Sequence, residues 1–160
     1  MKRSVRKRQD PDLGVLAARL FFGLQEELFR RSAEEGFDDI TPRHGAVLAY
    51  LDEDGIRPSE LAHLSGRHKQ TIGTIVDELE KLGYLRREAD PADRRAKLIM
   101  PTERGRRLMR YSDLVVAEIE ARHAALLGTE RYGQFKSTLR VIATAPPAPP
   151  APPSTTSSVR

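Results

Sequence analysis

Hydrophobic side chains recur at steps of three and four residues along most of the chain, which is the spacing of one face of an α-helix. The N-terminal part shows this spacing most clearly, in a row formed by Leu13, Leu16, Leu20, Leu24 and Leu28. The row predicts an amphipathic helix over residues 13–31. Its apolar face could belong to the core of the monomer or to an interface with another chain.

The middle of the chain predicts a helix-turn-helix. Thr41 supplies an N-cap hydroxyl before a proline, so a helix is expected to start there and to end in the acidic turn at 52–55. A short helix at 58–64 and a longer one at 69–82 follow, separated by a turn at Gly66. A short helix, a glycine turn and a longer helix are in the order typical of this motif.

The periodicity changes after Gly83, where two short strand-like runs flank a turn that begins at Asp90. This pattern predicts a β-hairpin. Helical spacing returns at Thr102, which can cap the next helix, and Gly128 separates that helix from a last one. The predicted ranges are 84–88 and 97–100 for the strands, and about 102–127 and 129–143 for the helices.

Composition narrows the possible functions. Hydrophobic residues make up 39% of the chain, enough for a core, and the absence of cysteine excludes disulfides and a thiolate nucleophile. The apolar runs are far too short for a membrane span, and no apolar stretch follows the basic N-terminus, so we expect a soluble cytoplasmic protein. The histidines are scattered and no nucleophile–base set can be assembled, so no metal, cofactor or enzymatic activity is expected.

The net charge of +4, from 27 basic and 23 acidic residues, is too modest to establish nucleic-acid binding by itself. Local arrangement is more informative. The helix at 69–82 carries polar side chains at its N-terminal end, suited to base edges in the major groove and to phosphates. Asp77, Glu78 and Glu80 follow, so this helix is expected to dock by its first two turns. Its predicted DNA contacts are His68, Lys69, Gln70, Thr71 and Thr74.

The hairpin after this helix supplies a run of cations, and a narrow minor groove attracts inserted arginine. We expect Asp93 to hold the rotamer of a neighbouring arginine and so to orient the wing. The predicted DNA contacts of the hairpin are Arg86, Arg87, Arg94, Arg95 and Lys97. A charge run alone could be a solvated loop, but a basic hairpin behind a helix-turn-helix indicates a winged helix.

Short motifs are distributed over residues 59–105. They are Ser-Glu-Leu-Ala at 59–62, Lys-Gln-Thr-Ile at 69–72, Leu-Glu-Lys-Leu-Gly-Tyr-Leu at 79–85, Asp-Pro-Ala-Asp-Arg-Arg-Ala-Lys at 90–97 and Thr-Glu-Arg-Gly at 102–105. Together they resemble the MarR (multiple antibiotic resistance regulator) family of winged-helix transcription factors. The chain departs from the family pattern at Arg67, His68, Pro101 and the pair Gly73-Thr74, which bears on base reading more than on the fold.

The resemblance implies a homodimer in which the first helix and the last two helices interlock. It also places the wing motif Asp-x-Arg on Asp93 and Arg95, so that Arg95 enters the minor groove and Arg94 contacts a phosphate. Members of the family often release DNA when a small aromatic or phenolic acid binds between the dimerisation and DNA-reading parts. The candidates for such a ligand site are Arg19, Phe22, His44 and Tyr50, which come from the two helices expected to border that space.

The expected fold class is mainly α with a small β-hairpin wing, combining a winged helix-turn-helix DNA-binding lobe with a helical dimerisation lobe. A winged helix leaves the flanking helices with apolar faces to bury, and obligate dimer interfaces resemble a core cut in half. The expected organisation is a basic flexible arm at 1–12, an N-terminal dimerisation helix at 13–40, the DNA-binding lobe at 41–101, C-terminal dimerisation helices at 102–144 and a proline-rich disordered tail at 145–160.

The sequence therefore predicts a homodimeric, sequence-specific transcriptional regulator, most often a repressor in this family, bound to double-stranded DNA at a pseudo-palindromic operator. Two alternatives remain open. The winged helix could be a protein-interaction module that uses the acidic turn at 52–54 and the proline-rich tail. It could also be a DNA-binding protein without sequence specificity.

Overall fold

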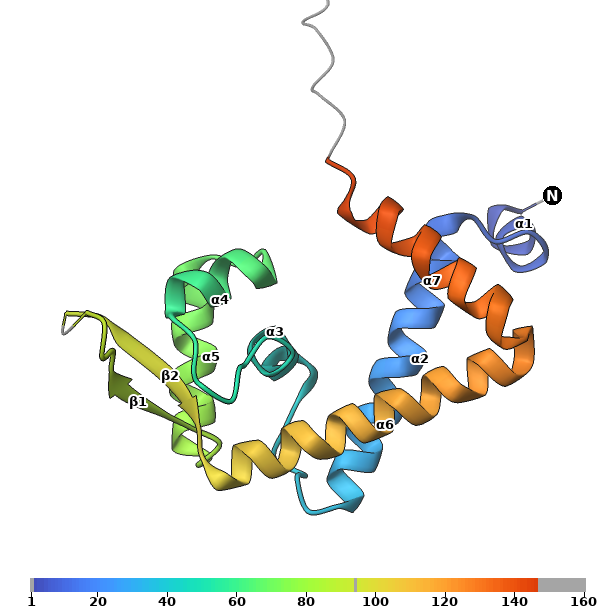
Figure 1. The fold of residues 1–160 in the computed structure, drawn as a ribbon. Helices are drawn as coiled ribbons and strands as arrows, with labels where there is room; N and C mark the ends of the chain where they lie inside the picture. Colours follow the sequence, from blue (N-terminus) through green and yellow to red (C-terminus); the bar gives the residue numbers. More distant parts are fainter. Residues whose placement is uncertain (1, 94, 147–160) are drawn as a thin grey trace, which may run out of the picture. The chain divides into compact units, whose positions relative to one another are not determined.

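The computed structural model describes residues 2–93 and 95–146, with Arg3 described by its backbone alone, and it is mainly helical with one β-hairpin (Figure 1). The proline-rich tail predicted at 145–160 therefore lies outside the described residues from 147 onward. The chain divides into two compact units, of which the first ends at Ile119 and the second begins at Glu120. The fold class predicted from the sequence is confirmed.

The N-terminal part is more helical than the sequence predicted. A short helix, α1 (Arg3–Gln9), occupies the segment expected to be a flexible arm. Its residues are mostly good helix formers, and Lys7 forms an ion pair of 2.5 Å with Asp12 just beyond it. Asp12 also caps the next helix, α2 (Leu13–Glu34), by accepting a hydrogen bond from the backbone N–H of Val15. That helix extends three residues past its predicted end.

The helix predicted from Thr41 to the acidic turn is much shorter than expected. It starts where predicted, but it consists of the 3₁₀ turn η1 (Pro42–His44) and the single α-helical turn α3 (Gly45–Leu48). Leu51 lies beyond the helix end and is nevertheless buried. The apolar pattern could not locate this end, because a tight turn buries the same residues as a continuing helix would.

The helix-turn-helix and the hairpin form where the sequence predicted them. They comprise α4 (Pro58–Ser65), α5 (Lys69–Lys81), β1 (Leu85–Ala89) and β2 (Lys97–Pro101). The strands pair antiparallel, and α5 packs against α3, α4 and β1 (Figure 1). Gly66, at φ 62°, ends α4 in the left-handed region that glycine tolerates. The core of this part contains Val47, Leu61, Ile72, Ile75, Val76, Leu79, Leu85 and Ile99.

Four residues lie together where the chain passes from α5 into the hairpin. We call this cluster the wing-root junction; it consists of Asp39, Leu82, Tyr84 and Arg104. The Tyr84 side chain is buried, and its hydroxyl donates to Asp39 Oδ1 at 2.5 Å. Arg104 donates from Nη1 to the Leu82 carbonyl at 2.7 Å, pairs with Asp39 Oδ2 at 3.0 Å and lies 4.3 Å from the Tyr84 ring centroid. Burial, followed by the Asp39 carboxylate, raises the pKa of Tyr84 far above its usual value.

The long helix α6 (Glu103–Leu127) begins against this junction. The hydroxyl of Thr102 accepts from the backbone N–H of Gly105 at 3.1 Å, which confirms the predicted cap, and it donates to the Gly83 carbonyl at 2.6 Å. Gly105 is buried, and a Cβ at this position would overlap the carbonyl of Tyr84. The close approach of the two backbones therefore requires glycine.

A buried carboxylate fastens the turn of the wing to the start of α4. Asp90 Oδ2 accepts hydrogen bonds from Arg57 Nε at 2.7 Å and from Nη2 at 2.5 Å, while Oδ1 accepts from the backbone N–H of Ala92 at 2.8 Å. The Ala92 hydrogen bond, followed by that of Arg57, holds the pKa of Asp90 below its usual range. The wing turn is thereby tied to the helix-turn-helix.

The second unit contains the end of α6 and α7 (Thr129–Thr144). Tyr132 packs between His123 and Phe135, and Lys136 forms an ion pair of 2.7 Å with Glu120. Apolar side chains of α7, including Val141 and Ile142, remain exposed. Among the described residues, no helix combines the length and apolar character that a membrane crossing requires.

We expect Gly105→Ala to lower the free energy of unfolding by about 1–3 kcal/mol, because the added methyl group pushes α6 away from the Tyr84 carbonyl. Urea unfolding followed by circular dichroism measures the change. Gly133→Ala is the matched control: it lies in α7 with no atom near its added Cβ, so it should gain up to about 1 kcal/mol from helix propensity. Equal stability of wild type and Gly105→Ala would contradict the role assigned to this contact.

Asp90→Asn should destabilise the protein at neutral pH, and this difference should shrink in acid. The folded pKa of Asp90 lies below its unfolded value, so its stabilisation is present above the unfolded pKa and is lost as pH falls through the folded pKa. Urea unfolding of both proteins should therefore give a constant difference from pH 7 to pH 5 and convergence below about pH 4. The control Asp113→Asn changes an exposed carboxylate of α6. A wild-type-minus-Asp90→Asn difference that stays constant into acid would rule out the ionised Asp90–Arg57 pair.

Candidate nucleic-acid interface

The N-terminal end of α5 presents the polar side chains that the sequence predicted. Lys69, Gln70, Thr71 and Thr74 are all exposed, while the opposite face of the helix is buried in the core. Thr74 Oγ1 donates to the Gln70 carbonyl at 3.1 Å, so its hydroxyl proton is used within the helix. His68 precedes the helix in extended conformation and makes no side-chain cap bond, as expected of a weak cap.

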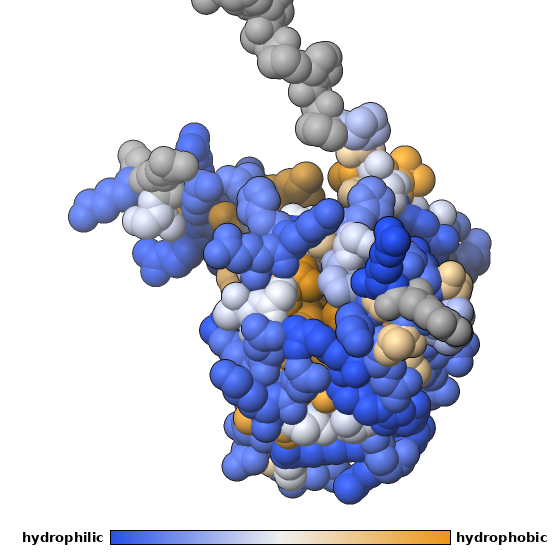
Figure 2. All heavy atoms as spheres, turned by 90° about the vertical axis from the view of Figure 1, so that its left-hand side faces the viewer, coloured by the Kyte–Doolittle hydropathy of each residue, from blue (hydrophilic) through white to orange (hydrophobic). Residues whose placement is uncertain are grey.

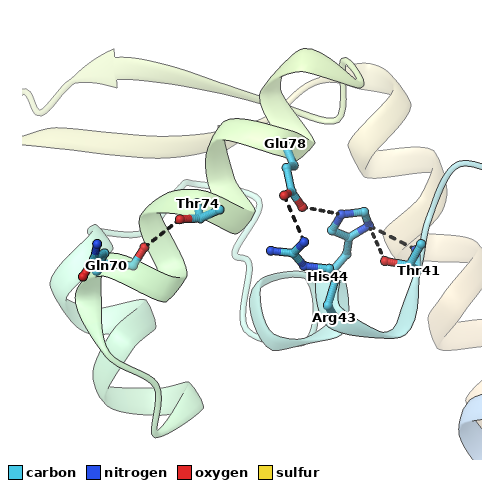
Figure 3. A network of polar contacts seen from close by, with 6 residues as sticks. All are labelled: Thr41, Arg43, His44, Gln70, Thr74 and Glu78. Atoms are coloured by element: carbon cyan, nitrogen blue, oxygen red, sulfur yellow. Dashed lines mark hydrogen bonds and ion pairs between the residues drawn. The ribbon is translucent and has the colours of Figure 1, made fainter.

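The inner side of α5 is fixed to η1 by a polar network (Figure 3). Glu78 Oε1 lies 3.1 Å from Arg43 Nη1, and Glu78 Oε2 lies 3.2 Å from His44 Nε2. His44 Nδ1 accepts from the backbone N–H of Thr41 at 3.1 Å, so in neutral His44 the proton is on Nε2 and is donated to Glu78. Glu78 therefore braces the recognition helix, and both ring nitrogens of His44 are engaged.

Four of the predicted contacts of the wing are exposed to solvent, namely Arg86, Arg87, Arg95 and Lys97. Arg94 lies outside the described residues. Asp93 Oδ1 accepts a hydrogen bond from the backbone N–H of Arg95 at 3.0 Å, so it orders the backbone of the turn. Its predicted action on an arginine side chain stays a prediction.

The two arginines of β1 are engaged with carboxylates. Arg86 Nε pairs with Glu88 of the same strand at 2.5 Å. Arg87 reaches back to α5, where it pairs with Asp77 at 2.5 Å and with Glu80. The sequence predicted that both arginines contact DNA, and the partners of Arg87 on α5 could not be read from local spacing.

The Arg57–Asp90 pair and the Arg43–Glu78 pair were also missed by the sequence reasoning. Arg57 and Asp90 are 33 residues apart, and no periodic pattern connects them. The Asp-Pro turn signal located the bend of the wing but not the guanidinium that holds it. Figure 2, which views the side carrying the wing, shows a surface composed mostly of hydrophilic residues with smaller hydrophobic patches between them.

The four candidate ligand residues occupy different environments. Arg19, Phe22 and Tyr50 are exposed, whereas His44 is buried in the network described above. A shallow cavity of about 260 Å³, open to solvent, lies elsewhere in the first unit, between the end of α2 and the first half of α6. Its lining residues are Glu35, Phe37, Arg107, Arg110, Tyr111 and Leu114.

This cavity combines cations with aromatic rings. The Arg107 guanidinium lies 5.9 Å from the Phe37 ring centroid, and the Tyr111 ring lies 6.4 Å from the same ring. Such a lining suits a planar anion. Across the described part of the chain, no group of three or more His, Cys, Asp or Glu side chains could hold a metal ion.

Comparison with known proteins supports the same family. Residues 38–96 match the MarR family. The transcriptional regulator HosA of Escherichia coli O111:H- is 25% identical over 108 residues, which cover 67% of this chain and 80% of HosA. The transcriptional repressor MprA of Escherichia coli K12 is 28% identical over 112 residues, 68% of this chain and 64% of MprA. These relatives are regulators and not enzymes, as the sequence predicted.

A solved structure extends the likeness over most of the chain. The transcriptional repressor CouR bound to a 23-mer DNA duplex is 28% identical, with a TM-score of 0.69 and coverage of 86% of this chain and 96% of that chain. CouR from Rhodococcus jostii RHA1 has also been solved with p-coumaroyl-CoA, and that structure gives a TM-score of 0.68. The sequence match over residues 38–96, the helix order and the winged-helix geometry together support a transcriptional regulator of the MarR family.

Proposed function

We propose that this protein is a homodimeric transcriptional repressor that binds a pseudo-palindromic operator in double-stranded DNA. The observation that carries the proposal is the exposed polar row on the first two turns of α5, followed by a hairpin that exposes Arg95 and Lys97. A helix fits the major groove, and arginine suits the narrow minor groove beside it. The likeness to CouR on DNA supports this use of the fold.

Dimerisation is supported by apolar side chains that one chain leaves uncovered. In α2, Leu13 is 68% exposed and Phe22 is 62% exposed, and α7 exposes Val141 and Ile142. Apolar surface of this kind marks an interface. A two-fold dimer presents two copies of α5, which is why the operator is expected to be pseudo-palindromic.

We further propose that a small aromatic acid binds this protein and releases it from DNA. The sequence candidates for the site are Arg19, Phe22, His44 and Tyr50, and the structure adds the cavity lined by Arg107 and its neighbours. The CouR complex with p-coumaroyl-CoA supports an effector of this chemistry in a similar fold.

A path from the cavity to the recognition helix also favours an effector there. The Phe37 ring in the cavity wall lies 6.2 Å from the Tyr84 ring of the wing-root junction. Arg104 of that junction donates to the carbonyl of Leu82, the C-cap of α5. A ligand that moves Phe37 would therefore act on the end of the recognition helix.

Arg95→Ala should weaken operator binding by about 1–3 kcal/mol, because a guanidinium placed in the groove is lost. Fluorescence anisotropy on duplex DNA from upstream of the gene measures the affinity, and sedimentation confirms that the dimer persists. Arg30→Ala, on the exposed side of α2, is the control and should bind like wild type. Unchanged affinity of Arg95→Ala would remove the wing from the mechanism.

The same titration separates the alternatives. Repeated over a range of salt concentrations and on scrambled duplex, it should give a steep salt dependence and a clear preference for the operator. Equal affinity for the scrambled duplex would indicate a non-specific binder. Absence of salt-dependent DNA binding would favour a protein-interaction module.

For the effector, calorimetry with p-coumarate, benzoate and 4-hydroxybenzoate should detect binding that also releases DNA. Arg107→Ala should weaken it by about tenfold or more, the usual cost of losing a hydrogen bond to a charged group. Arg106→Ala, on the same helix but not lining the cavity, is the matched control. If Arg107→Ala binds these acids as tightly as wild type, the cavity is not the effector site.

A further inference from the structure

The guanidinium of Arg87 is shared by two carboxylates of the recognition helix. Its Nη2 lies 2.5 Å from Asp77 Oδ1, and its Nη1 pairs with Glu80. The other oxygen of Glu80 accepts from the backbone N–H of Arg87 at 3.2 Å. One strand residue therefore engages two acids on α5 through both its side chain and its backbone.

Asp77 lies on the same face of α5 as the residues expected to read DNA. Steps of four and three residues connect Gln70, Thr74 and Asp77, which is the spacing of one helical row. Asp77 is one step beyond Thr74, about 4.5 Å along the helix axis, and its side chain is 58% exposed. When the first two turns of α5 dock in the major groove, this carboxylate comes close to the phosphate backbone.

The second half of α5 would repel DNA if its acids stood alone. Asp77, Glu78 and Glu80 outweigh Lys81 at this end of the helix. In the structure each of the three carboxylates pairs with a guanidinium from another element: Glu78 with Arg43 of η1, and Asp77 and Glu80 with Arg87 of β1. The Arg43 pair lies on the inner side of the helix, whereas the Arg87 pairs flank the DNA-reading row.

We infer that Arg87 supports DNA binding by neutralising Asp77 and Glu80, and not by contacting a phosphate itself. Its two terminal nitrogens are already engaged with these carboxylates, and its side chain is only 32% exposed. A phosphate contact would require it to leave both acids uncompensated beside DNA. Arg87 is thus a positioning residue that permits the recognition helix to approach the duplex. This inference rests on the proposed DNA-binding function.

The neighbouring arginine provides a contrast. Side chains alternate along a strand, so Arg86 and Arg87 point to opposite faces of the hairpin. Arg86 pairs with Glu88 of its own strand and with neither of the two α5 acids. If Arg86 is replaced and DNA affinity falls, neutralising Asp77 and Glu80 should therefore not restore that affinity.

The test is a charge-rescue experiment in the full chain, measured by anisotropy on the operator duplex at several salt concentrations. Arg87→Met retains the apolar stem but removes the charge, and it should weaken binding by about tenfold, since two uncompensated acids then face phosphates. Arg87→Met combined with Asp77→Asn and Glu80→Gln should return to within about threefold of wild type, because the repulsion is gone. Arg87→Lys, which keeps the charge, should stay close to wild type.

The salt dependence of binding and the same rescue attempted on Arg86→Met distinguish charge neutralisation from the other possible roles of Arg87. If Arg87 contacts a phosphate, the triple variant will not recover, and its log–log salt slope will remain shallower by about 0.9. If Arg87 only stabilises the fold, DNA affinity will again not recover in the triple variant. The free energy of unfolding will then fall in both Arg87→Met and the triple variant. A lack of effect in Arg87→Met also overturns the inference. Arg86→Met should not be rescued by the same two neutral substitutions, and a rescue there would show that the recovery is a general charge effect.

The result can be separated from the proposed function. If the wild-type protein does not bind duplex DNA, the proposed function itself fails. If the wild type binds and the triple variant does not recover, only the role inferred for Arg87 is wrong.

Discussion

The contact on which the DNA-reading part depends most is that of the Arg104 guanidinium with three segments at once. It contacts the C-cap of α5 at the Leu82 carbonyl, the loop before η1 at Asp39 and the start of the hairpin at the ring of Tyr84. The backbone of α6 is pressed against the same point, because Gly105 leaves no side chain between it and the Tyr84 carbonyl. The recognition helix, the wing and the long helix thus meet at the wing-root junction.

Ion pairs determine which charges are exposed around the wing-root junction. The recognition helix carries all three of its acidic residues in its second half, and arginines from η1 and β1 are paired with them. The turn of the wing is held in the same way, by Arg57 on the buried Asp90. The cations that remain for an external partner are therefore those near the N-terminus of α5 and at the wing, such as Lys69 and Arg95. The arrangement is one in which internal ion pairs determine which charges a duplex would meet.

The elements that local periodicity specifies were predictable, and the contacts between them were not. The range predicted for α5 ends one residue beyond the observed helix, and Gly66, Gly83 and Thr102 marked their boundaries correctly because a turn or a cap acts within a few residues. The N-terminal helix α1 was missed because its basic residues have no apolar row to reveal it. The end of α3 was misplaced because burial of Leu51 does not require a helix.

At the candidate site, the polar face of α5 followed from the same periodicity. The partners of Arg57 and Arg87 depend on how the hairpin folds back onto the helices. The sequence separation within these pairs does not reveal that arrangement. The exposure of Lys69, Gln70 and Arg95 could thus be anticipated, whereas the engagement of Arg87 could not.

The internal hydrogen bond of Thr74 has a consequence for base chemistry. Its hydroxyl proton is donated to the Gln70 carbonyl, so only oxygen lone pairs and a methyl group remain for a partner. In the major groove, lone pairs are matched by the exocyclic amino groups of adenine and cytosine, and the methyl group is matched by that of thymine. Guanine offers only acceptors on that edge. A base-facing Thr74 would therefore match adenine, cytosine and the methyl group of thymine, and it would have no donor to offer guanine.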